Sequence, residues 1–160
     1  MSKVLDKRTW ESINNANDKG ALGTTIPITI DIATVDTYEK IIGTYIDSSA
    51  VCSGFTVTTD GKLTLTAESG DFELSGVSTL EVDSACTTSH AIFVNGVLYT
   101  TPDGKTFETP NTFTQQAKLT TIAVRGILHL IQGDYIEIFA KSSALNNVTI
   151  NNLSTTLKRW

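Results

Sequence analysis

The amino-acid sequence predicts an all-β fold, an antiparallel sandwich or jelly roll. Thr (26), Ile (15) and Val (10) make up about a third of the 160 residues, and side chains branched at Cβ favour extended backbone. From Tyr38 onward, apolar and polar residues alternate with a period of two, as in strands with one buried face. Turn signals recur about every 8–12 residues, a spacing typical of sandwiches. We therefore expect about eight to ten short strands in one domain.

The first 35 residues differ from the rest of the chain. The N-terminal stretch can form about one or two turns of weak helix, which an Asn-rich segment then breaks. A Thr- and Ile-rich extended segment follows, in which Pro27 suits an edge strand or an arm better than a central strand. We therefore predict an arm over residues 1–35 that anchors the chain to another molecule, and a domain over residues 36–160. The candidate anchoring residues are Val4, Leu5, Trp10, Ile13, Leu22, Ile26 and Ile28.

Residues 55–65 form the first predicted hairpin of the domain. A two-residue Asp60-Gly61 loop would place Val57 opposite Thr64, an apolar side chain against a polar one. A three-residue loop over 59–61 places Val57 opposite Leu63 and keeps one face apolar. We expect this second register, with Gly61 left-handed in a bulge after a type I turn. The exposed face would then carry a ladder of Thr56, Thr58 and Thr64.

Residues 72–82 show the clearest alternation in the chain. The even-numbered positions are apolar or small, while the odd-numbered positions are polar except for Val77. A helix would spread these apolar residues over every face, so the pattern indicates a strand with its even positions buried. The acidic residues on its odd face, Asp71, Glu73 and Glu81, are expected to lie in solvent.

The remaining strands are separated by specific turn residues. Asn95-Gly96 predicts a type I′ hairpin between 92–94 and 97–99, because both loop positions need positive φ. Both faces of this pair are apolar, so we expect the pair to lie centrally. Further strands are predicted over 121–124, 127–131, 135–140 and 148–157. Asp134 follows Gly133 in a tight connection, where its carboxylate can satisfy backbone groups.

Charge and hydropathy exclude two classes of partner. The chain carries 12 basic and 17 acidic residues, a formal net charge of −5, and phosphate contacts need clustered Lys and Arg. We expect no nucleic-acid partner. No stretch approaches the roughly 18 apolar residues of a membrane span, and the N-terminus lacks the apolar core of a secretory signal. We therefore expect a chain made in the cytoplasm, without membrane insertion.

Catalytic and cofactor motifs are missing from the sequence. It contains no phosphate-binding G-x-x-x-x-G-K-[ST], no G-x-G-x-x-G, no H-E-x-x-H and no G-x-S-x-G. His129 stands between Leu128 and Leu130, so its side chain is expected on the opposite, exposed face; a metal or catalytic role is the alternative. A weak cation site near Asp134 or Asp47 is a second alternative. We expect no enzyme activity, no metal and no cofactor.

The cysteines and the last residue carry two further expectations. Cys52 and Cys86 are the only cysteines, and a chain made in the cytoplasm favours two buried free thiols over a disulfide between them. Trp160 ends the chain. Because a large ring is costly to leave in water, we expect it to dock on its own domain or on a neighbouring subunit.

Several segments of residues 50–160 together resemble the tumour-necrosis-factor and complement-globular-head jelly rolls. Residues 127–138, ILHLIQGDYIEI, resemble the family's L-x-L-x-x-G-D-x-[IV]-x-[IL] signature, in which a Gly-Asp turn joins two late strands. Residues 91–96 resemble its Asn-Gly hairpin, and residues 62–66 and 70–82 resemble its earlier strands, in the same order. The signature residues here are Asn95, Gly96, Leu128, Leu130, Gly133, Asp134, Ile136 and Ile138.

The resemblance implies a tight homotrimer. Small knob domains of bacteriophage virion proteins are similar in being rich in Thr and Asn and in lacking a signal peptide. The short arm and the absence of a shaft favour a head fibre or capsid decoration protein over a long tail fibre. We expect a non-enzymatic structural protein of a virion, made in the host cytoplasm and anchored to the major capsid protein or another virion protein.

Three other functions stay open. One is an enzyme such as a hydrolase of surface polysaccharide, for which the sequence offers no recognisable catalytic set. The chain can be the receptor-binding tip of a tail fibre or spike, which binds a host surface glycan or protein through the Thr ladder or the 101–112 loop. It can also be a jelly-roll binding module unrelated to viruses, since fold analogy alone does not fix function.

Overall fold

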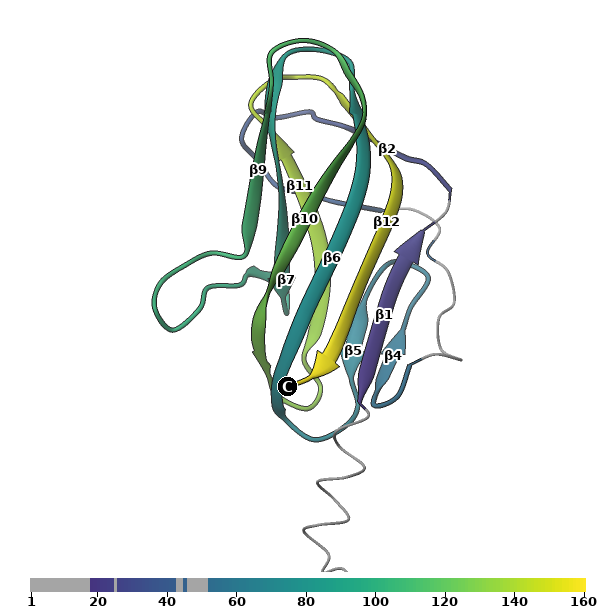
Figure 1. Cartoon of the computed structure of the whole chain (residues 1–160), viewed down its shortest axis with the longest axis vertical. Helices are drawn as coiled ribbons and strands as arrows, with labels where there is room; N and C mark the ends of the chain where they lie inside the picture. Colours follow the sequence, from purple (N-terminus) through teal and green to yellow (C-terminus); the bar gives the residue numbers. More distant parts are fainter. Residues whose placement is uncertain (1–17, 25, 43–44, 46–51) are drawn as a thin grey trace, which may run out of the picture.

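The described part of the chain consists of two antiparallel sheets packed face to face (Figure 1). The structure is a computed structural model that describes residues 18–24, 26–42, 45 and 52–160. Every regular element in these residues is a strand. The strands are β1 (Lys19–Thr24), β2 (Ile28–Asp31), β3 (Glu39–Lys40), β4 (Phe55–Val57), β5 (Leu63–Leu65), β6 (Gly70–Val82), β7 (Cys86–Val94), β8 (Val97–Leu98), β9 (Glu108–Phe113), β10 (Ala117–Leu130), β11 (Tyr135–Ser142) and β12 (Asn147–Arg159).

Each sheet brings together strands from distant parts of the chain. The first sheet has the order β1-β12-β6-β10, and β2 also pairs with β12. The second sheet has the order β4-β5-β11-β7-β8, with β3 on β11 and β9 on β7. Consecutive strands thus cross repeatedly from one sheet to the other, as in a jelly roll.

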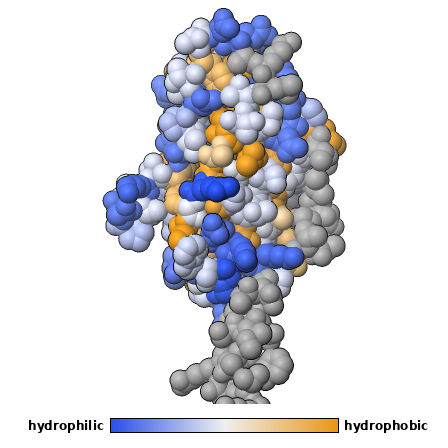
Figure 2. All heavy atoms as spheres, in the orientation of Figure 1, coloured by the Kyte–Doolittle hydropathy of each residue, from blue (hydrophilic) through white to orange (hydrophobic). Residues whose placement is uncertain are grey.

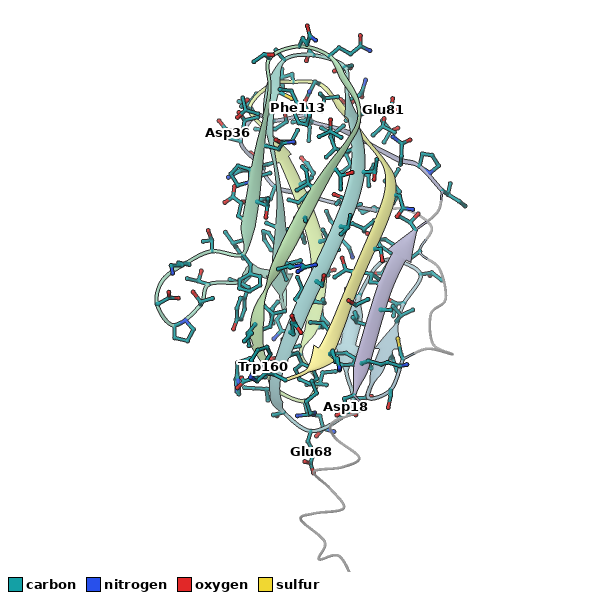
Figure 3. All side chains as sticks on the ribbon, viewed as in Figure 1. Asp18, Asp36, Glu68, Glu81, Phe113 and Trp160 are labelled. Atoms are coloured by element: carbon teal, nitrogen blue, oxygen red, sulfur yellow. The ribbon has the colours of Figure 1, made fainter. Side chains whose placement is uncertain are left out.

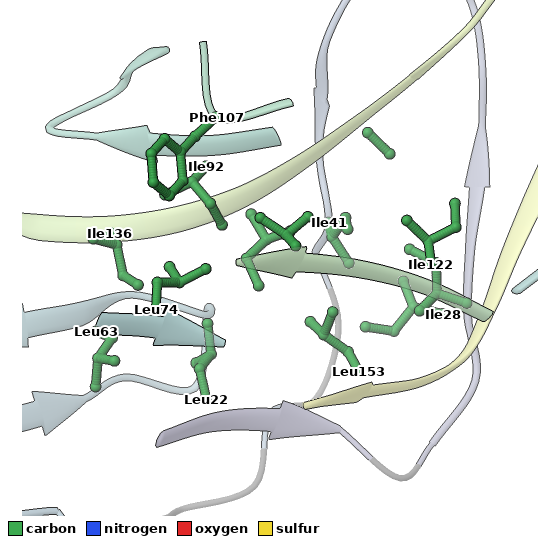
Figure 4. Packing of buried hydrophobic residues seen from close by; sticks show 14 of the residues in the cluster. Leu22, Ile28, Ile41, Leu63, Leu74, Ile92, Phe107, Ile122, Ile136 and Leu153 are labelled. Carbon is green, nitrogen blue, oxygen red and sulfur yellow. The ribbon is translucent and has the colours of Figure 1, made fainter. Parts of the chain in front are cut away.

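The core lies between the inner faces of the two sheets (Figure 4). Strand β6 alternates as its sequence predicts: Phe72, Leu74 and Leu80 are fully buried, while Val77 faces outward. Leu74 and Leu153 from the first sheet face Ile92 and Ile136 from the second. Burial of such side chains contributes about 1.5–3 kcal/mol each, so this interface is the main source of the domain's stability.

Both predicted hairpins adopt the expected turns. Phe55, Thr56 and Val57 pair with Leu65, Thr64 and Leu63, and Gly61 is left-handed with φ +82°. Asn95 and Gly96 have φ values of +52° and +77°, as a type I′ turn requires. β7 is central as expected, but β8 lies at the sheet edge, and Val97 is exposed.

The boundary predicted at residue 35 is wrong for the residues described from 18 onward. β1 pairs with β12 from Lys19–Lys158 to Thr24–Leu153, and β2 pairs with the start of β12. The alternating burial of β1 and β2 places their apolar side chains in the core. This part of the expected arm is therefore an integral part of the first sheet.

Candidate functional surfaces

The outward face of the first sheet carries exposed apolar side chains (Figure 2). Val77 on β6 and Ile127 on β10 are each 42% exposed. Val77 lies opposite Ala123 on β10 and Ser154 on β12, so its neighbours across the sheet are small. At Val77 this face can therefore approach another protein surface closely.

An ion pair and a backbone hydrogen bond hold the C-terminus at the lower end of the same sheet (Figure 3). The Arg159 guanidinium forms an ion pair with the buried Asp18 carboxylate, with Nη2 and Oδ2 2.8 Å apart. The Trp160 backbone N–H donates to the Asp71 carbonyl oxygen over 2.9 Å. The Trp160 side chain is nevertheless 75% exposed, so the expectation that it docks on its own domain is wrong. Its docking on a neighbouring subunit stays a prediction.

A hairpin loop between β8 and β9 projects from the body of the molecule (Figure 1). Two backbone hydrogen bonds form a turn over residues 101–105. The Thr101 N–H donates to the Lys105 carbonyl oxygen, and the Gly104 N–H donates to the Thr101 carbonyl oxygen, both over 2.8 Å. The Thr101 hydroxyl also donates to the Asp103 carboxylate. That hydrogen bond and the Lys105 ammonium, 3.0 Å away, hold the pKa of Asp103 below its usual value. The loop tip is therefore exposed but internally well braced.

A groove of about 430 Å³ separates this loop from strand β10. Its lining includes Asp103, Lys105 and Glu108 on the loop side and Arg125 and Ile127 on the strand side. The volume falls in the range of about 300–1,000 Å³ found for ligand sites. The 101–112 segment, predicted as a binding loop, is a loop only as far as Phe107, because β9 begins at Glu108. Residues of this segment form one wall of the groove.

The Phe107 ring holds the base of the loop against β10. A Cβ atom on Gly126 would lie only 2.0 Å from the Phe107 ring, so only glycine at this position leaves room for the ring. Phe107 also packs edge-on against Tyr99, with ring centroids 5.4 Å apart. This contact joins the two sheets at the groove, and no sequence motif indicated it.

His90 is buried between the sheets and has only one polar partner. Its Nδ1 lies 2.9 Å from the Ser78 hydroxyl, while its Nε2 is buried without a hydrogen-bond partner in the described residues. Burial lowers the pKa of His90 to about 4. A cavity of about 20 Å³ adjoins both residues, large enough for one water molecule. Protonation of the His90 imidazole would therefore destabilise the packed interior.

His129 lies on the exposed face, as predicted. Its Nδ1 is 2.7 Å from the Asp71 carboxylate, and both side chains are mostly exposed. In the described residues no group of three or more His, Cys, Asp or Glu could hold a metal ion. The metal and catalytic alternatives for His129 gain no support from this geometry. Asp47, the other candidate for a cation site, lies outside the described residues.

The predicted signature residues lie in two turns that contact each other, at Asn95-Gly96 and Gly133-Asp134, and in strands β10 and β11. The Asp134 carboxylate accepts hydrogen bonds from the Ile131 N–H over 2.8 Å and from the Asn95 amide over 2.7 Å. The Asn95 side-chain oxygen accepts from the Tyr135 N–H over 3.1 Å. The apolar members, Leu128, Leu130, Ile136 and Ile138, are all buried. The apolar members are therefore core residues, while Asn95 and Asp134 join two surface turns to each other.

The candidate anchoring residues divide into three groups. Val4, Leu5, Trp10 and Ile13 lie outside the described residues. Leu22 and Ile28 are buried in the core of their own domain, so their assignment as anchors is wrong. Ile26 is 56% exposed and remains available for contact.

The cysteines lie apart from the candidate surfaces. Cys86 is a buried free thiol whose sulfur accepts a hydrogen bond from the Asn146 amide over 3.2 Å, so the alternative disulfide to Cys52 does not form. Cys52 is only partly buried, so the expectation of two buried thiols holds for Cys86 alone. The Cys52 sulfur accepts a hydrogen bond from the Ala21 N–H over 3.4 Å. In the residues that the structure describes, no helix is long and apolar enough to cross a membrane.

Comparison with known proteins identifies the fold. No family model matches the sequence, and no curated protein matches it. Among solved structures, the chain is similar to murine APRIL, with a TM-score of 0.51 and 12% identity over 82% of this chain and 97% of that one. It is also similar to the tumour necrosis factor Eiger from S. frugiperda, with a TM-score of 0.48 and 14% identity over 89% and 94% of the two chains. Together with its sheet topology, the likeness to APRIL shows that this chain has the tumour-necrosis-factor-like jelly-roll fold.

Proposed function

We propose that the chain is a non-enzymatic structural protein that assembles as a homotrimer in a bacteriophage virion, as a head fibre or capsid decoration protein. It would be made in the host cytoplasm and would display the jelly roll at the particle surface. The tumour-necrosis-factor-like fold and the sequence resemblance to small phage knob domains support this proposal. The missing catalytic motifs support the non-enzymatic part.

The observation that carries self-association is the set of exposed apolar side chains on the outward face of the first sheet. Val77 is exposed there between the small side chains of Ala123 and Ser154, Ile127 is exposed opposite Glu73, and the exposed Trp160 lies at the lower end of this face. Exposed apolar side chains grouped on one face are typical of protein interfaces. A second copy that covers this face would remove them from water.

The oligomeric state tests self-association directly. We expect light scattering on the purified full-length chain to give a mass close to three times 17.2 kDa, and the mass should resist dilution if the interface is of the large obligate class. Val77→Lys should yield monomer, because it places a charge in the interface. Val97→Lys is the matched control, since Val97 is exposed on the other sheet. A monomeric wild-type chain would contradict the trimer.

Attachment to the particle would use the N-terminal residues 1–17 and the exposed Ile26. Leu22 and Ile28 belong to the core and are left out of this role. We expect a chain that lacks residues 1–17 to keep its oligomeric state and to lose binding to the major capsid protein in a pull-down assay. Retained binding by this shortened chain would contradict the anchoring role.

A second function is favoured by the braced loop between β8 and β9. Pro102 to Lys105 are exposed at the tip of this loop, and a binding tip benefits from such a preorganised protrusion. In this alternative the chain is the receptor-binding tip of a tail fibre or spike that recognises a host surface glycan or protein. Binding to host envelopes that is lost on replacing 102–104 would favour this function.

A further inference from the structure

Strand β10 has a free edge beside the groove. Among the described strands only β6 pairs with β10, in a register that runs from Thr120–Leu80 to Leu130–Gly70. On the opposite side of β10, the loop between β8 and β9 stands away from the strand and leaves the groove open. An open strand edge presents unpaired N–H and C=O groups.

The hydrogen bonds at the two ends of the groove show which residues direct these groups outward. The Thr109 hydroxyl donates to the Ala123 carbonyl oxygen over 3.4 Å, and the His129 N–H donates to the Tyr99 hydroxyl over 3.0 Å. Neither partner belongs to β6, so the odd-numbered residues of β10 point their backbone groups toward the free edge. Backbone direction alternates along a strand. Arg125 and Ile127 therefore present two N–H and two C=O groups to the groove.

The same alternation holds on the neighbouring strand. The Asp71 carbonyl oxygen accepts from the Trp160 N–H of the C-terminus, and the Ser75 carbonyl oxygen accepts from Thr156 on β12. Odd-numbered residues of β6 thus face β12, and the odd-numbered residues of β10 opposite them face away from β6. The hydrogen bonds of both strands therefore agree that the backbone groups of Arg125 and Ile127 point to the open edge.

Arg125 is the one charged side chain of the groove lining that forms no ion pair within the described residues. The Glu108 carboxylate lies 2.9 Å from the Lys141 ammonium. Burial of Glu108 opposes its ionisation, but the hydrogen bonds from Lys141, Tyr38 and Ser89 and the charge of Lys141 together outweigh burial and hold the pKa of Glu108 below its usual value. Asp103 forms an ion pair with Lys105. The exposed Arg125 guanidinium has no ion-pair partner within the described part of the chain.

We propose that this groove binds an extended segment of another polypeptide, which adds as a strand to the β10 edge and places an acidic side chain against Arg125. The alternating donors and acceptors at residues 125 and 127 match the main chain of a strand. The uncompensated guanidinium favours a carboxylate, which it can bind with two parallel hydrogen bonds. This inference rests on the groove alone and needs neither the trimer nor the virion.

Amide hydrogen exchange in the full-length protein tests the open edge first. The Arg125 and Ile127 amides should exchange quickly, whereas the Val124 and Gly126 amides, which face β6, should be protected. If the Arg125 and Ile127 amides are already protected, another part of the protein or a second copy occupies the edge, and the proposal is wrong.

A blocked pentapeptide, acetyl-Thr-Val-Glu-Val-Thr-amide, then serves as the probe. We expect it to shift the NMR signals of the Arg125 and Ile127 amides and to slow their exchange. Its analogue with Gln in place of Glu should bind about threefold to fivefold more weakly, the range of an exposed ion pair. An analogue N-methylated at alternate residues should not bind, because it lacks the donors for the ladder.

Two variants test whether the glutamate of the peptide is bound by Arg125 itself or is attracted by any exposed cation on the sheet. Arg125→Gln should remove the preference for Glu over Gln, while Lys158→Gln, at an exposed position on β12, should leave it unchanged. Equal binding of the N-methylated peptide, or no shift at residues 125 and 127, would overturn strand addition. Stronger shifts at these amides with methyl glucuronide than with the peptide would make the groove a saccharide site and also overturn the proposal.

Discussion

Among single residues, His90 links the stability of this domain most directly to pH. Its imidazole lies between the sheets, with Ser78 on one nitrogen and no partner for the other in the described residues. A charged imidazole would there lose its hydration and gain little in return, which is why the pKa falls to about 4. The neutral form is compatible with the apolar core around it.

The resulting pH dependence has a definite sign. The unfolded chain binds a proton at His90 below about pH 6.5, while the folded chain does so only near pH 4. Stability from this residue is therefore fully present above pH 6.5 and declines as the pH falls toward 4. We expect the free energy of unfolding to fall by about 2 kcal/mol from this cause between pH 7.5 and 5. Urea titrations at both pH values should show a smaller decline for His90→Asn.

Asp134 is a second residue whose substitution should lower the stability of the domain. It satisfies the Ile131 N–H and the Asn95 amide at once, and so joins two turns. Asp134→Ala should lower the free energy of unfolding by about 1–3 kcal/mol, because it leaves these donors without their acceptor. Asp103→Ala should cost less, since Asp103 braces only the exposed loop tip. Equal losses for the two variants in denaturant titrations would contradict the linking role.

At the scale of elements, the chain uses one turn twice in different surroundings. Residues 58–62 and 101–105 share the pattern Thr-x-Asp-Gly-Lys. In both, the threonine hydroxyl contacts the aspartate, and the glycine N–H donates to the threonine carbonyl oxygen. The first turn packs against the domain, with Gly61 beside Tyr45, while the second projects into solvent. The sequence of a turn thus determines its local geometry but not its place in the molecule.

The two glycines provide a matched comparison. Gly61 and Gly104 both have φ +82°, so replacement by alanine imposes the same backbone strain, about 1–2 kcal/mol. A Cβ on Gly61 would also lie 2.4 Å from the Tyr45 ring, whereas a Cβ on Gly104 meets nothing within 4 Å. Thermal unfolding should therefore show a larger loss of stability for Gly61→Ala than for Gly104→Ala. Equal losses would mean that Tyr45 moves aside without cost.

For the whole molecule, β12 is the strand that holds the first sheet together. It pairs with β6 along its length on one side, and with β1 and β2 on the other. Strands β1 and β2 from the N-terminal part of the chain therefore lie directly beside the C-terminal strand β12 in one sheet. The ion pair between Arg159 and Asp18 further joins the end of β12 to the residue before β1.

Truncation at the N-terminus tests this architecture. Deleting residues 1–35 removes four buried apolar side chains of the described residues, Leu22, Ile28, Ile30 and Ile32, each of which contributes about 1.5–3 kcal/mol. The sum is comparable with the total stability of a typical domain, about 5–15 kcal/mol. We expect this variant to be unfolded by circular dichroism and the variant lacking only residues 1–17 to stay folded. A folded 36–160 fragment would contradict the assignment of β1 and β2 to the core.

The sequence by itself determined the features that depend on neighbouring residues. The alternation along β6, the three-residue loop at Gly61 and the type I′ turn at Asn95 all follow from side-chain period and backbone preference within about a dozen residues. The signature residues 128–138 further indicated the jelly-roll class, which the comparison with APRIL confirmed.

Only the tertiary structure decided the features that depend on distant strands. It placed residues 19–31 in the sheet beside β12, buried His90 against Ser78, left Trp160 exposed and seated Phe107 on Gly126 to form the groove. An extended apolar segment such as 22–32 has the same local pattern in an arm as in a strand. Which of the two it becomes depends on whether another strand offers a free edge and a core to cover, and this information lies elsewhere in the chain.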